Sequence, residues 1–455
     1  MAYYILKSYK LKVDPSQIFA VLKDKKNCFF LDSSLNANYY LGRYSFLGID
    51  PFYIFATKNQ NSFAQLREIF NRYKISIPKN NLPFLGGAVG YLAYDLGFAL
   101  EEKLKAKPRP DLRIPDCLFG FYNTILIVDH LKQKFYIFSV GFPEKNYRLA
   151  KLLCERNFKE IYKLLSQINL YQISNRKDKF KKQIRELKSN FDKEDYLSAV
   201  KEAKRYIKNG DIYQVNLSQQ FHTKTDLSGF EIYKRLRQIS PSFFSAYFDA
   251  GNFQILSSSP ERFLKLEDNI VSTRPMKGTR PRAKDRRQDR KFKEQLLYSP
   301  KDKAELIMIV DLERNDLGRV CSYDSVKVTQ LRELEEYSTV FQTTATVQGH
   351  LHKDKDRLDL LRACFPGGSI TGCPKIRAME IIEELEPTRR SIYTGCLGYL
   401  SFCGNMDFNI LIRTILKKDE RLYFGVGGGI VADSKPEDEY QETLVKARAM
   451  IEAIS

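Results

Sequence analysis

The chain has 455 residues and a net charge of +19, from 74 Lys and Arg against 55 Asp and Glu, and 43% of its residues are hydrophobic. This composition is sufficient for a large folded core, and no apolar stretch approaches the ~18 residues that a membrane-spanning helix needs. The charge would permit binding to nucleic acid, but the basic runs contain no recognition motif and no interleaved aromatic residues, so we expect no nucleic-acid and no membrane partner.

The first 165 residues are predicted to form a region of strands and helices, from the alternation and continuity of their apolar residues. Strands are expected at 2–8, 27–33, 44–48, 51–56, 86–91, 118–128 and 134–140, and helices at 15–22, 62–73 and 147–168. The strands at 44–48 and 51–56 are expected to pair with each other. Between 174 and 190, seven basic residues and few large apolar ones indicate a linker or an exposed helix.

The later residues have the patterns of both strands and amphipathic helices. Helices are expected at 193–209, 301–317, 376–385 and 436–454, with a basic, exposed helix start at 280–294, and strands at 215–223, 243–250, 253–257, 409–416 and 421–425. The glycines at 427–429 are expected to break the last strand before it resumes at 430–431. Ser434 and Glu437 have the spacing of a capping box at the start of the last helix.

The eight cysteines form no CxxC pair and show no zinc-ligand spacing. We therefore expect most of them to be buried, in a protein of a reducing compartment. Residues 1–10 lack a basic segment followed by an apolar run, so no signal peptide is expected. The predicted location is the cytoplasm.

Lys277 stands between Pro275 and Gly278, in a segment expected to turn between a strand and a charged helix. Proline fixes one φ angle and glycine permits turns that other residues resist, so this lysine can be aimed, whereas most lysines are exposed on the surface. Glu261, just after a predicted strand, can pass protons at such a site, although it is equally well explained as a structural neighbour of Arg262.

Two acidic pairs share one spacing. Asp302 and Glu305 are three residues apart in one predicted helix, and Glu439 and Glu442 are three apart in another. Residues three apart share a helix face, so each helix can present two carboxylates to one point. If the two faces meet, several carboxylates converge, which is costly unless a cation lies between them. Mg²⁺ suits such a site, because it binds a few protein oxygens and keeps water in its other coordination positions. The alternative is two solvated helix faces.

Two glycine-rich segments and one arginine suggest an anionic ligand. Residues 366–375 precede a helix, and exposed N–H groups at such a helix start bind anions, as the backbone at Gly427 and Gly429 can. The segment is equally well explained as a tight structural turn, and the GxxxxGK[ST] phosphate loop is absent. Arg413 lies in an apolar segment, and a buried arginine requires either an internal carboxylate or a substrate carboxylate.

These motifs together resemble the chorismate-utilising enzymes, the family that includes component I of anthranilate synthase and component I of aminodeoxychorismate synthase. The resemblance is strong at 210–217 (GDIYQVNL), 259–263 (SPERF), 309–316 (IVDLERND), 367–375 (GGSITGCPK) and 427–431 (GGGIV), and weaker at 42–48 (GRYSFLG). It implies an α/β (α+β) fold in which two large antiparallel sheets pack as a sandwich surrounded by helices. It also implies an N-terminal region at 1–165, a linker at 166–190 and a chorismate-binding catalytic domain at 191–455.

Two positions discriminate between reactions within the family. Isochorismate and salicylate synthases carry a water-activating lysine where this chain has Gln214, which disfavours hydroxylation. Anthranilate synthases carry alanine where this chain has Lys277. A lysine there marks aminodeoxychorismate synthase, in which it attacks ring carbon 2 of chorismate, the 4-hydroxyl leaves, ammonia adds at carbon 4 and the lysine departs. The attacking amine must be neutral, which from a pKa of ~10.4 costs roughly 4–5 kcal/mol at pH ~7 unless its surroundings lower that pKa.

The resemblance also implies roles for other residues. Glu261 matches the proton donor to the leaving hydroxyl, Glu305 and Glu442 match Mg²⁺ ligands, and Asp302 and Glu439 assist them. The substrate-binding positions are Ser369, Thr371, Tyr393, Arg413, Gly427, Gly429, Gln214, Gly278 and Thr279. One departure from the family is Gln342, which stands where anthranilate synthase has a histidine and which cannot shuttle protons.

The implied reaction converts chorismate and ammonia to 4-amino-4-deoxychorismate, toward p-aminobenzoate and folate. The four histidines form no Cys–His glutaminase constellation, so the use of glutamine would require a separate amidotransferase subunit, component II. Two alternatives stay open. One is anthranilate synthase component I, against which Lys277 argues, and the other is a basic protein that binds nucleic acid or a partner through an inactive catalytic shell.

Overall fold

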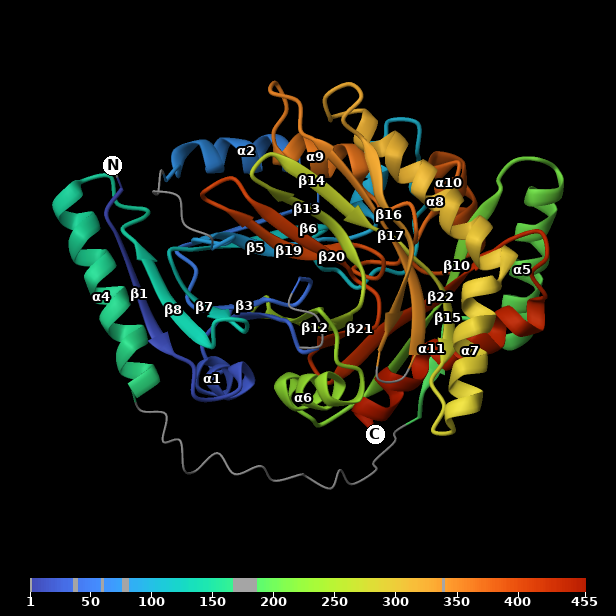
Figure 1. Cartoon of the computed structure of the whole chain (residues 1–455), viewed down its shortest axis with the longest axis horizontal. Helices are drawn as coiled ribbons and strands as arrows, with labels where there is room; N and C mark the ends of the chain where they lie inside the picture. The colour runs from blue at the N-terminus through green and yellow to red at the C-terminus, as the bar shows by residue number, and fades with distance from the viewer. Residues whose placement is uncertain (1, 36–39, 59–60, 76–81, 167–185, 338–339) are drawn as a thin grey trace.

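A computed structural model of the chain describes residues 2–35, 40–58, 61–75, 82–166, 186–337 and 340–455. Within these ranges, two large antiparallel sheets face each other and helices surround them (Figure 1), so the predicted fold class is confirmed. Most of the linker expected at 166–190 lies outside the described residues. The division of the chain into an N-terminal region and a catalytic domain stays a prediction.

The larger sheet, with twelve strands in the described ranges, combines strands from early and late in the chain. In spatial order its main path is β1 (Tyr4–Lys10), β8 (Lys134–Val140), β7 (Thr124–Asp129), β3 (Tyr44–Gly48), β2 (Phe29–Asp32), β11 (Phe244–Asp249), β12 (Gln254–Ser259), β21 (Thr414–Lys418), β22 (Arg421–Ile430), β10 (Gln214–Lys224) and β18 (Gly372–Cys373), and β9 (Lys188–Ser189) pairs with β10.

The smaller sheet has ten strands in the same ranges. Its main path is β15 (Met276–Pro281), β17 (Val340–His350), β14 (Ile270–Arg274), β13 (Arg262–Glu267), β20 (Met406–Ile410), β19 (Cys396–Ser401), β5 (Gly87–Leu92), β6 (Cys117–Tyr122) and β4 (Tyr53–Thr57), and β16 (Lys327–Glu336) pairs with β17. Aromatic side chains fill the space between the sheets. Phe46 of β3 meets Tyr399 of β19 with ring centroids 5.4 Å apart, so the two sheets share one core.

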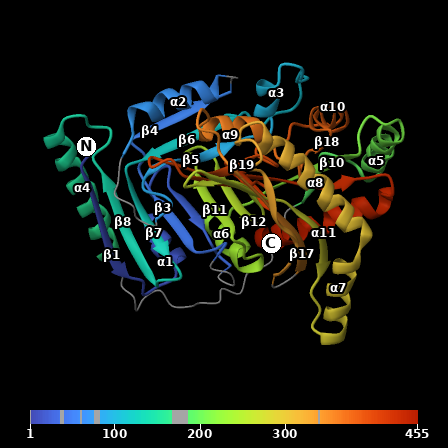
Figure 2. The same ribbon diagram turned by 45° about the horizontal axis from the view of Figure 1, so that its top comes forward.

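Helices cover both sheets. α4 (Tyr147–Ser166), α6 (Gly229–Ile239) and α11 (Pro436–Ile454) pack on the larger sheet, and α7 (Arg286–Tyr298) and α8 (Pro300–Gly318) pack on β15 and β17 of the smaller one. The remaining described helices are α1 (Pro15–Leu22), α2 (Ser62–Arg72), α3 (Leu96–Leu100), α5 (Lys193–Lys208), α9 (Arg357–Cys364) and α10 (Lys375–Leu385). Figure 2 shows α2 and α9 at the same edge of the molecule, where Arg67 of α2 pairs with Asp356 at 2.8 Å. In the described part of the chain, the helices are all too short or too polar to cross a membrane.

Two predicted strand relations are wrong. The strands predicted at 44–48 and 51–56 do not pair, because β3 lies in the larger sheet and β4 in the smaller. The strand predicted at 118–128 is two strands, β6 and β7, which lie in different sheets and are separated by Asn123 alone. Both strands are buried along their whole length, so the apolar pattern contains no break. Asn123 holds the crossing, because its Nδ2 donates to the backbone oxygen of Phe142 at 2.7 Å.

The last strand and the start of the last helix also differ from prediction. β22 continues through the glycines at 427–429 to Ile430, because residues 216–218 of β10 pair with them in an unbroken register. Ser434 does not cap α11, whose N-cap is Lys435 without a side-chain bond. The Ser434 hydroxyl donates instead to Glu439 Oε1 at 2.6 Å, so it orients one of the predicted metal-site acids.

The basic segment at 280–294 does not continue into the next predicted helix. Helices α7 and α8 are separate, and Ser299 ends the first and caps the second, because its hydroxyl accepts the Asp302 backbone N–H at 3.2 Å. Pro300 at the first position of α8 prevents one continuous helix. The helices predicted at 15–22, 62–73, 147–168, 193–209, 301–317, 376–385 and 436–454 are confirmed to within two residues at each end.

Candidate active site

Lys277 lies on a strand, β15, and not in the turn predicted from Pro275 and Gly278. β15 pairs with β17, and the register shifts between Lys277 and Thr279, which makes a bulge at Gly278 with φ of +71°. A Cβ at Gly278 would lie 2.7 Å from a methyl group of Leu296, so the position requires glycine for space as well as for its backbone. The lysine is therefore positioned by strand pairing and not by a free loop.

Lys277, Ser369 and Glu261 form one hydrogen-bonded chain. Lys277 Nζ donates to the backbone oxygen of Ser369 at 3.0 Å, and the Ser369 hydroxyl donates to Glu261 Oε1 at 2.7 Å. Glu261 lies in the short link between β12 and β13, where only 4% of the residue is exposed. The amine and the carboxyl group that the sequence proposes as catalytic groups therefore meet on opposite sides of one serine.

Burial shifts the pKa values of both groups toward their neutral forms. It raises the pKa of Glu261 to about 7, although the hydrogen bond from Ser369 and the charge of Lys277 act in the opposite direction. It lowers the pKa of Lys277, against the charges of Glu305 and Glu261. A buried acid and a partly buried base thus lie side by side, and the pKa of each is shifted in the direction that proton donation and nucleophilic attack require.

The two acidic helices direct their carboxylates toward this pair. The charge of Glu442, on α11, acts on Glu305, on α8, and the charges of both act on Lys277. Burial, with a smaller contribution from Asp302 and Glu442, raises the pKa of Glu305. A Cβ at Gly428 would lie 3.0 Å from Glu439 Oε2. The backbone of β22 can therefore lie close to this carboxylate because residue 428 has no side chain.

All four acids have a neighbouring side chain as partner: Asp302 accepts from Arg280 at 2.9 Å, Glu439 accepts from Ser434 at 2.6 Å, Glu442 pairs with Lys446 at 2.7 Å, and Glu305 pairs more loosely with Lys301 at 3.9 Å. The described residues contain no group of three or more His, Cys, Asp or Glu spaced to hold a metal ion by itself. The carboxylates of Glu305 and Glu442 nevertheless lie close enough to interact, and such a pair suits Mg²⁺. This ion takes one or two protein carboxylates and fills its other coordination positions with water and substrate.

Of the predicted carboxylate-binding residues, Gly427 and Gly429 lie on β22 and Tyr393 packs against that strand. Arg413 lies between β20 and β21, and not inside a strand as predicted, with φ of +49°. Its guanidinium has no ion pair within the described ranges, and burial lowers its pKa. Tyr393 stacks against β22 so closely that a Cβ at Gly425 would lie 2.3 Å from its ring. A partly buried arginine without a carboxylate partner among the described residues is consistent with a substrate carboxylate.

Thr371 and Thr279 have their hydroxyl groups engaged by the protein. Thr371 Oγ1 donates to the Gly367 backbone oxygen at 2.7 Å, which tightens the glycine-rich loop. Thr279 Oγ1 accepts from Gln342 Nε2 at 3.2 Å. Gln342, which stands where anthranilate synthase has a histidine, lies on β17, and this strand pairs with β15, which carries Lys277.

Two charged residues near the site were missed in the sequence. Lys446 donates to the Gly427 backbone oxygen at 2.8 Å, and its charge acts on both Lys277 and Glu261. Its position four residues after Glu442 was the available signal. Arg390, 4% exposed, donates to Glu386 and to the backbone oxygens of Asn216 and Ile370 at 2.6 and 3.0 Å. No local pattern indicated that it fixes the glycine-rich loop.

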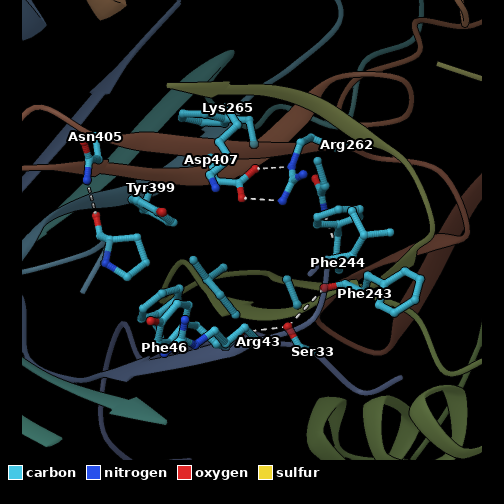
Figure 3. Close-up of a pocket in the computed structure, with 18 of the residues that line it drawn as sticks. Ser33, Arg43, Phe46, Phe243, Phe244, Arg262, Lys265, Tyr399, Asn405 and Asp407 are labelled. Atoms are coloured by element: carbon cyan, nitrogen blue, oxygen red, sulfur yellow. Dashed lines mark hydrogen bonds and ion pairs between the residues drawn. The ribbon is translucent and has the colours of Figure 1, made fainter. Parts of the chain in front are cut away.

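A separate cavity of about 410 Å³ lies between the two sheets (Figure 3). Its wall includes Phe46 and Tyr399, and the ion pair between Arg262 and Asp407, at 3.0 Å, lies along one side. Lys277, Glu261 and Ser369 do not line it, so it is distinct from the candidate active site.

The chain is similar to known proteins along most of its length. A family model described as chorismate binding enzyme matches residues 26–452. The sequence is 39% identical over 460 residues to anthranilate synthase component 1 of Acetivibrio thermocellus, covering 97% of this chain and 92% of that protein. It is 40% identical over 400 residues to aminodeoxychorismate synthase component 1 of Escherichia coli (strain K12), covering 88% of this chain and 83% of that protein. The crystal structure of anthranilate synthase component I from Streptococcus pneumoniae TIGR4 superposes with a TM-score of 0.79 at 31% identity, covering 90% of this chain and 92% of that one.

Proposed function

The chain belongs to the family of chorismate binding enzymes, and on this premise we propose that it is component I of an aminodeoxychorismate synthase. It would convert chorismate and ammonia to 4-amino-4-deoxychorismate. Relatives with about the same identity include both anthranilate synthases and aminodeoxychorismate synthases, so the choice between the two reactions depends on the residues of the site. The observation that carries the proposal is the position of Lys277, hydrogen-bonded to Ser369 beside Glu261.

In the proposed reaction Lys277 forms a covalent bond to the substrate. The neutral amine attacks ring carbon 2 of chorismate, the ring double bonds shift and the C4–O bond breaks. Glu261 gives its proton to the departing oxygen, which leaves as water. Ammonia then adds at carbon 4, the Lys277–C2 bond breaks, and the surplus proton on the new amine returns to Glu261. The nucleophile divides one difficult displacement into two easier ones.

Other residues would bind and orient the substrate. Arg413 and the backbone N–H groups at Gly427 and Gly429 suit its carboxylates. Glu305 and Glu442 would hold Mg²⁺, with Asp302 and Glu439 assisting. When bound, the ion neutralises and orients a substrate carboxylate. Ammonia would come from a glutamine amidotransferase subunit, component II, as the family resemblance suggests.

The proposal predicts a bell-shaped dependence of the rate on pH. The competent form has a neutral Lys277 and a protonated Glu261. At low pH the lysine is protonated and cannot attack, and at high pH the carboxyl loses its proton and cannot donate it, so the rate falls in both directions. Because burial raises the Glu261 pKa to about 7, one limb should lie near pH 7.

A pH series of kcat/KM for chorismate measures this, and Glu261→Gln is the diagnostic variant. The kcat/KM of this variant should be about 10²–10⁴-fold lower than that of the wild type. Its pH profile should lack the limb near pH 7. If the limb persists unchanged in this variant, the titrating group is not Glu261.

Product analysis distinguishes the proposed reaction from its alternatives. Purified protein with chorismate, Mg²⁺ and an ammonium salt should form 4-amino-4-deoxychorismate, identified by chromatography and mass spectrometry, and p-aminobenzoate only after a lyase is added. Fluorescent anthranilate formed without any lyase would show that the protein is an anthranilate synthase. Absence of chorismate turnover together with strong, salt-dependent DNA binding would favour the nucleic-acid alternative.

A further inference from the structure

The strand that carries Lys277 is the last on one side of the smaller sheet. Among the described residues, β15 pairs with β17 alone, and the bulge at Gly278 shifts the register of that pairing one residue after the lysine. A strand that is paired on one side only and interrupted by a bulge has fewer hydrogen bonds to fix it than a central strand. The position of the Lys277 side chain therefore depends on what else holds β15.

The corner between α7 and α8 lies against this bulge. A Cβ at Gly278 would lie 2.7 Å from a methyl group of Leu296 and 3.0 Å from the carboxyl carbon of Asp302. Leu296 is fully buried near the end of α7, and Asp302 is 8% exposed in the first turn of α8. Arg332 of β16 fixes the corner, because it donates to the backbone oxygens of Leu296 and Ser299, both at 2.9 Å. Both helices thus pack on the one residue of β15 that has no side chain.

An ion pair joins the same corner to β15 a second time, beyond the bulge. Arg280 Nη2 donates to Asp302 Oδ2 at 2.9 Å. Because the carboxylate is buried, it is costly for it to lose this partner. The Asp302 side chain therefore holds β15 at two points, Gly278 and Arg280, which are one and three residues after Lys277.

We infer that Asp302 is a positioning residue for the nucleophile: its side chain packs on Gly278 and pairs with Arg280, and so fixes the strand that carries Lys277. This inference rests on the proposed function, in which the Lys277 amine attacks the substrate. Displacing a reacting group by about 1 Å can lower a rate ~10²-fold, so the attack depends on how firmly β15 is held. This role is separate from the assistance to Mg²⁺ that the proposed function gives to Asp302, because it acts through the strand.

Two substitutions of opposite charge separate positioning from electrostatics. Asp302→Asn removes a negative charge next to β15, and Arg280→Met removes a positive one. An effect of charge alone on the Lys277 amine would therefore differ in sign between the two variants. Loss of the ion pair loosens β15 in both, so positioning predicts a slower attack in both. The double variant should be no slower than either single variant, because all three lack the same interaction.

The rate of adduct formation tests this directly. It is measured by rapid-quench mass spectrometry at saturating chorismate and Mg²⁺, without ammonia. The rate should fall about 10–100-fold in Asp302→Asn and in Arg280→Met. Arg280→Lys keeps a cation to pair with Asp302 and should recover most of the rate.

Arg282→Met is the matched control. Arg282 directly follows β15 and pairs with Asp289 at 2.9 Å, the same distance as the pair of Arg280 with Asp302. The exposed fractions of the two arginine side chains are also alike, 30% for Arg282 and 31% for Arg280. The control variant should form the adduct at the wild-type rate, because its ion pair lies away from the bulge.

Calorimetric titration with Mg²⁺ alone separates the strand from the metal. Asp302→Asn should bind Mg²⁺ with a Kd close to that of the wild type. Slow attack with weak Mg²⁺ binding in Asp302→Asn, together with a normal rate in Arg280→Met, would overturn the inference and assign Asp302 to the metal. Circular dichroism checks folding, and should Arg280→Met be unfolded, the rate and the Mg²⁺ affinity of Asp302→Asn still decide between strand and metal.

The outcomes also distinguish this inference from the proposed function. Adduct formation at the wild-type rate in both Asp302→Asn and Arg280→Met would overturn the positioning role and leave the covalent mechanism in place. If the wild type itself forms no adduct, the proposed function fails, and the positioning role fails with it.

Discussion

Replacing Lys277 with alanine should reduce kcat/KM for amination of chorismate by about 10³–10⁶-fold, the range found when a covalent nucleophile is removed. The side chain is fixed by the pairing of β15 with β17 and by its bond to the Ser369 backbone oxygen. Burial lowers its pKa and so favours the neutral amine. The nearby Lys446 amine is paired with Glu442, so we do not expect it to take over the attack in the alanine variant. The measurement is the initial rate of 4-amino-4-deoxychorismate formation with ammonium as the nitrogen source.

Two variants separate nucleophilic attack from an electrostatic role. Lys277→Arg keeps the positive charge, but a guanidinium does not lose its proton at neutral pH, so its rate should be as low as that of the alanine variant. Lys265→Ala removes a lysine of β13 that pairs with Glu267 away from the candidate site, and it should retain normal activity. Substantial activity in Lys277→Arg would mean that the charge of Lys277, and not its lone pair, is what the reaction uses.

Replacing Arg390 with methionine should destabilise the fold by about 3–5 kcal/mol, as expected when one partner of a buried ion pair is removed. Arg390 and Glu386 are 4% and 3% exposed, and two hydrogen bonds of 2.7 and 2.9 Å join them. Glu386 also accepts the backbone N–H and the hydroxyl of Ser218, so it would remain buried with its charge uncompensated. In the methionine variant, the backbone oxygens of Asn216 and of Ile370, in the glycine-rich loop, would also lose the hydrogen bonds that Arg390 donates to them.

Denaturant unfolding of the wild type and the variant measures this loss. The double variant Arg390→Met/Glu386→Gln should recover part of it, because it removes the unpaired charge as well. Arg205→Met is a suitable control, since that exposed arginine pairs with Glu202 on the same helix, and exposed pairs of this kind contribute about 0–1 kcal/mol. Equal unfolding midpoints for Arg390→Met and the wild type would contradict the role assigned to this ion pair.

Local sequence patterns predicted what depends on local structure. The helices follow from periodicity and from nearby residues such as Pro300, and the i,i+3 spacing placed each pair of acids on one helix. The apolar pattern did not reveal which sheet a strand joins. β6 and β7 are both fully buried, and the single residue Asn123 between them marks the crossing from one sheet to the other.

The site depends on contacts between residues far apart in the sequence. Lys277 was predicted to be aimed by a Pro–Gly turn, but strand pairing with residues more than 60 positions later positions it. The same holds for Arg390, whose bond to the Asn216 backbone spans 174 positions. Resemblance to a family supplied the roles of Glu261 and the acids, whereas the Gln214 amide, which has no hydrogen-bond partner among the described residues, became visible only when the burial of each polar atom was known.

The central claim is that Lys277 becomes covalently attached to the substrate. Intact-protein and peptide mass spectrometry of the wild type, quenched after incubation with chorismate and Mg²⁺ but without ammonia, tests it most directly. We predict a mass increase equal to chorismate less one water, on the peptide that contains Lys277, and its disappearance when ammonium is added. An adduct on a different residue, or turnover with ammonia but no adduct under any quench condition, would contradict the mechanism.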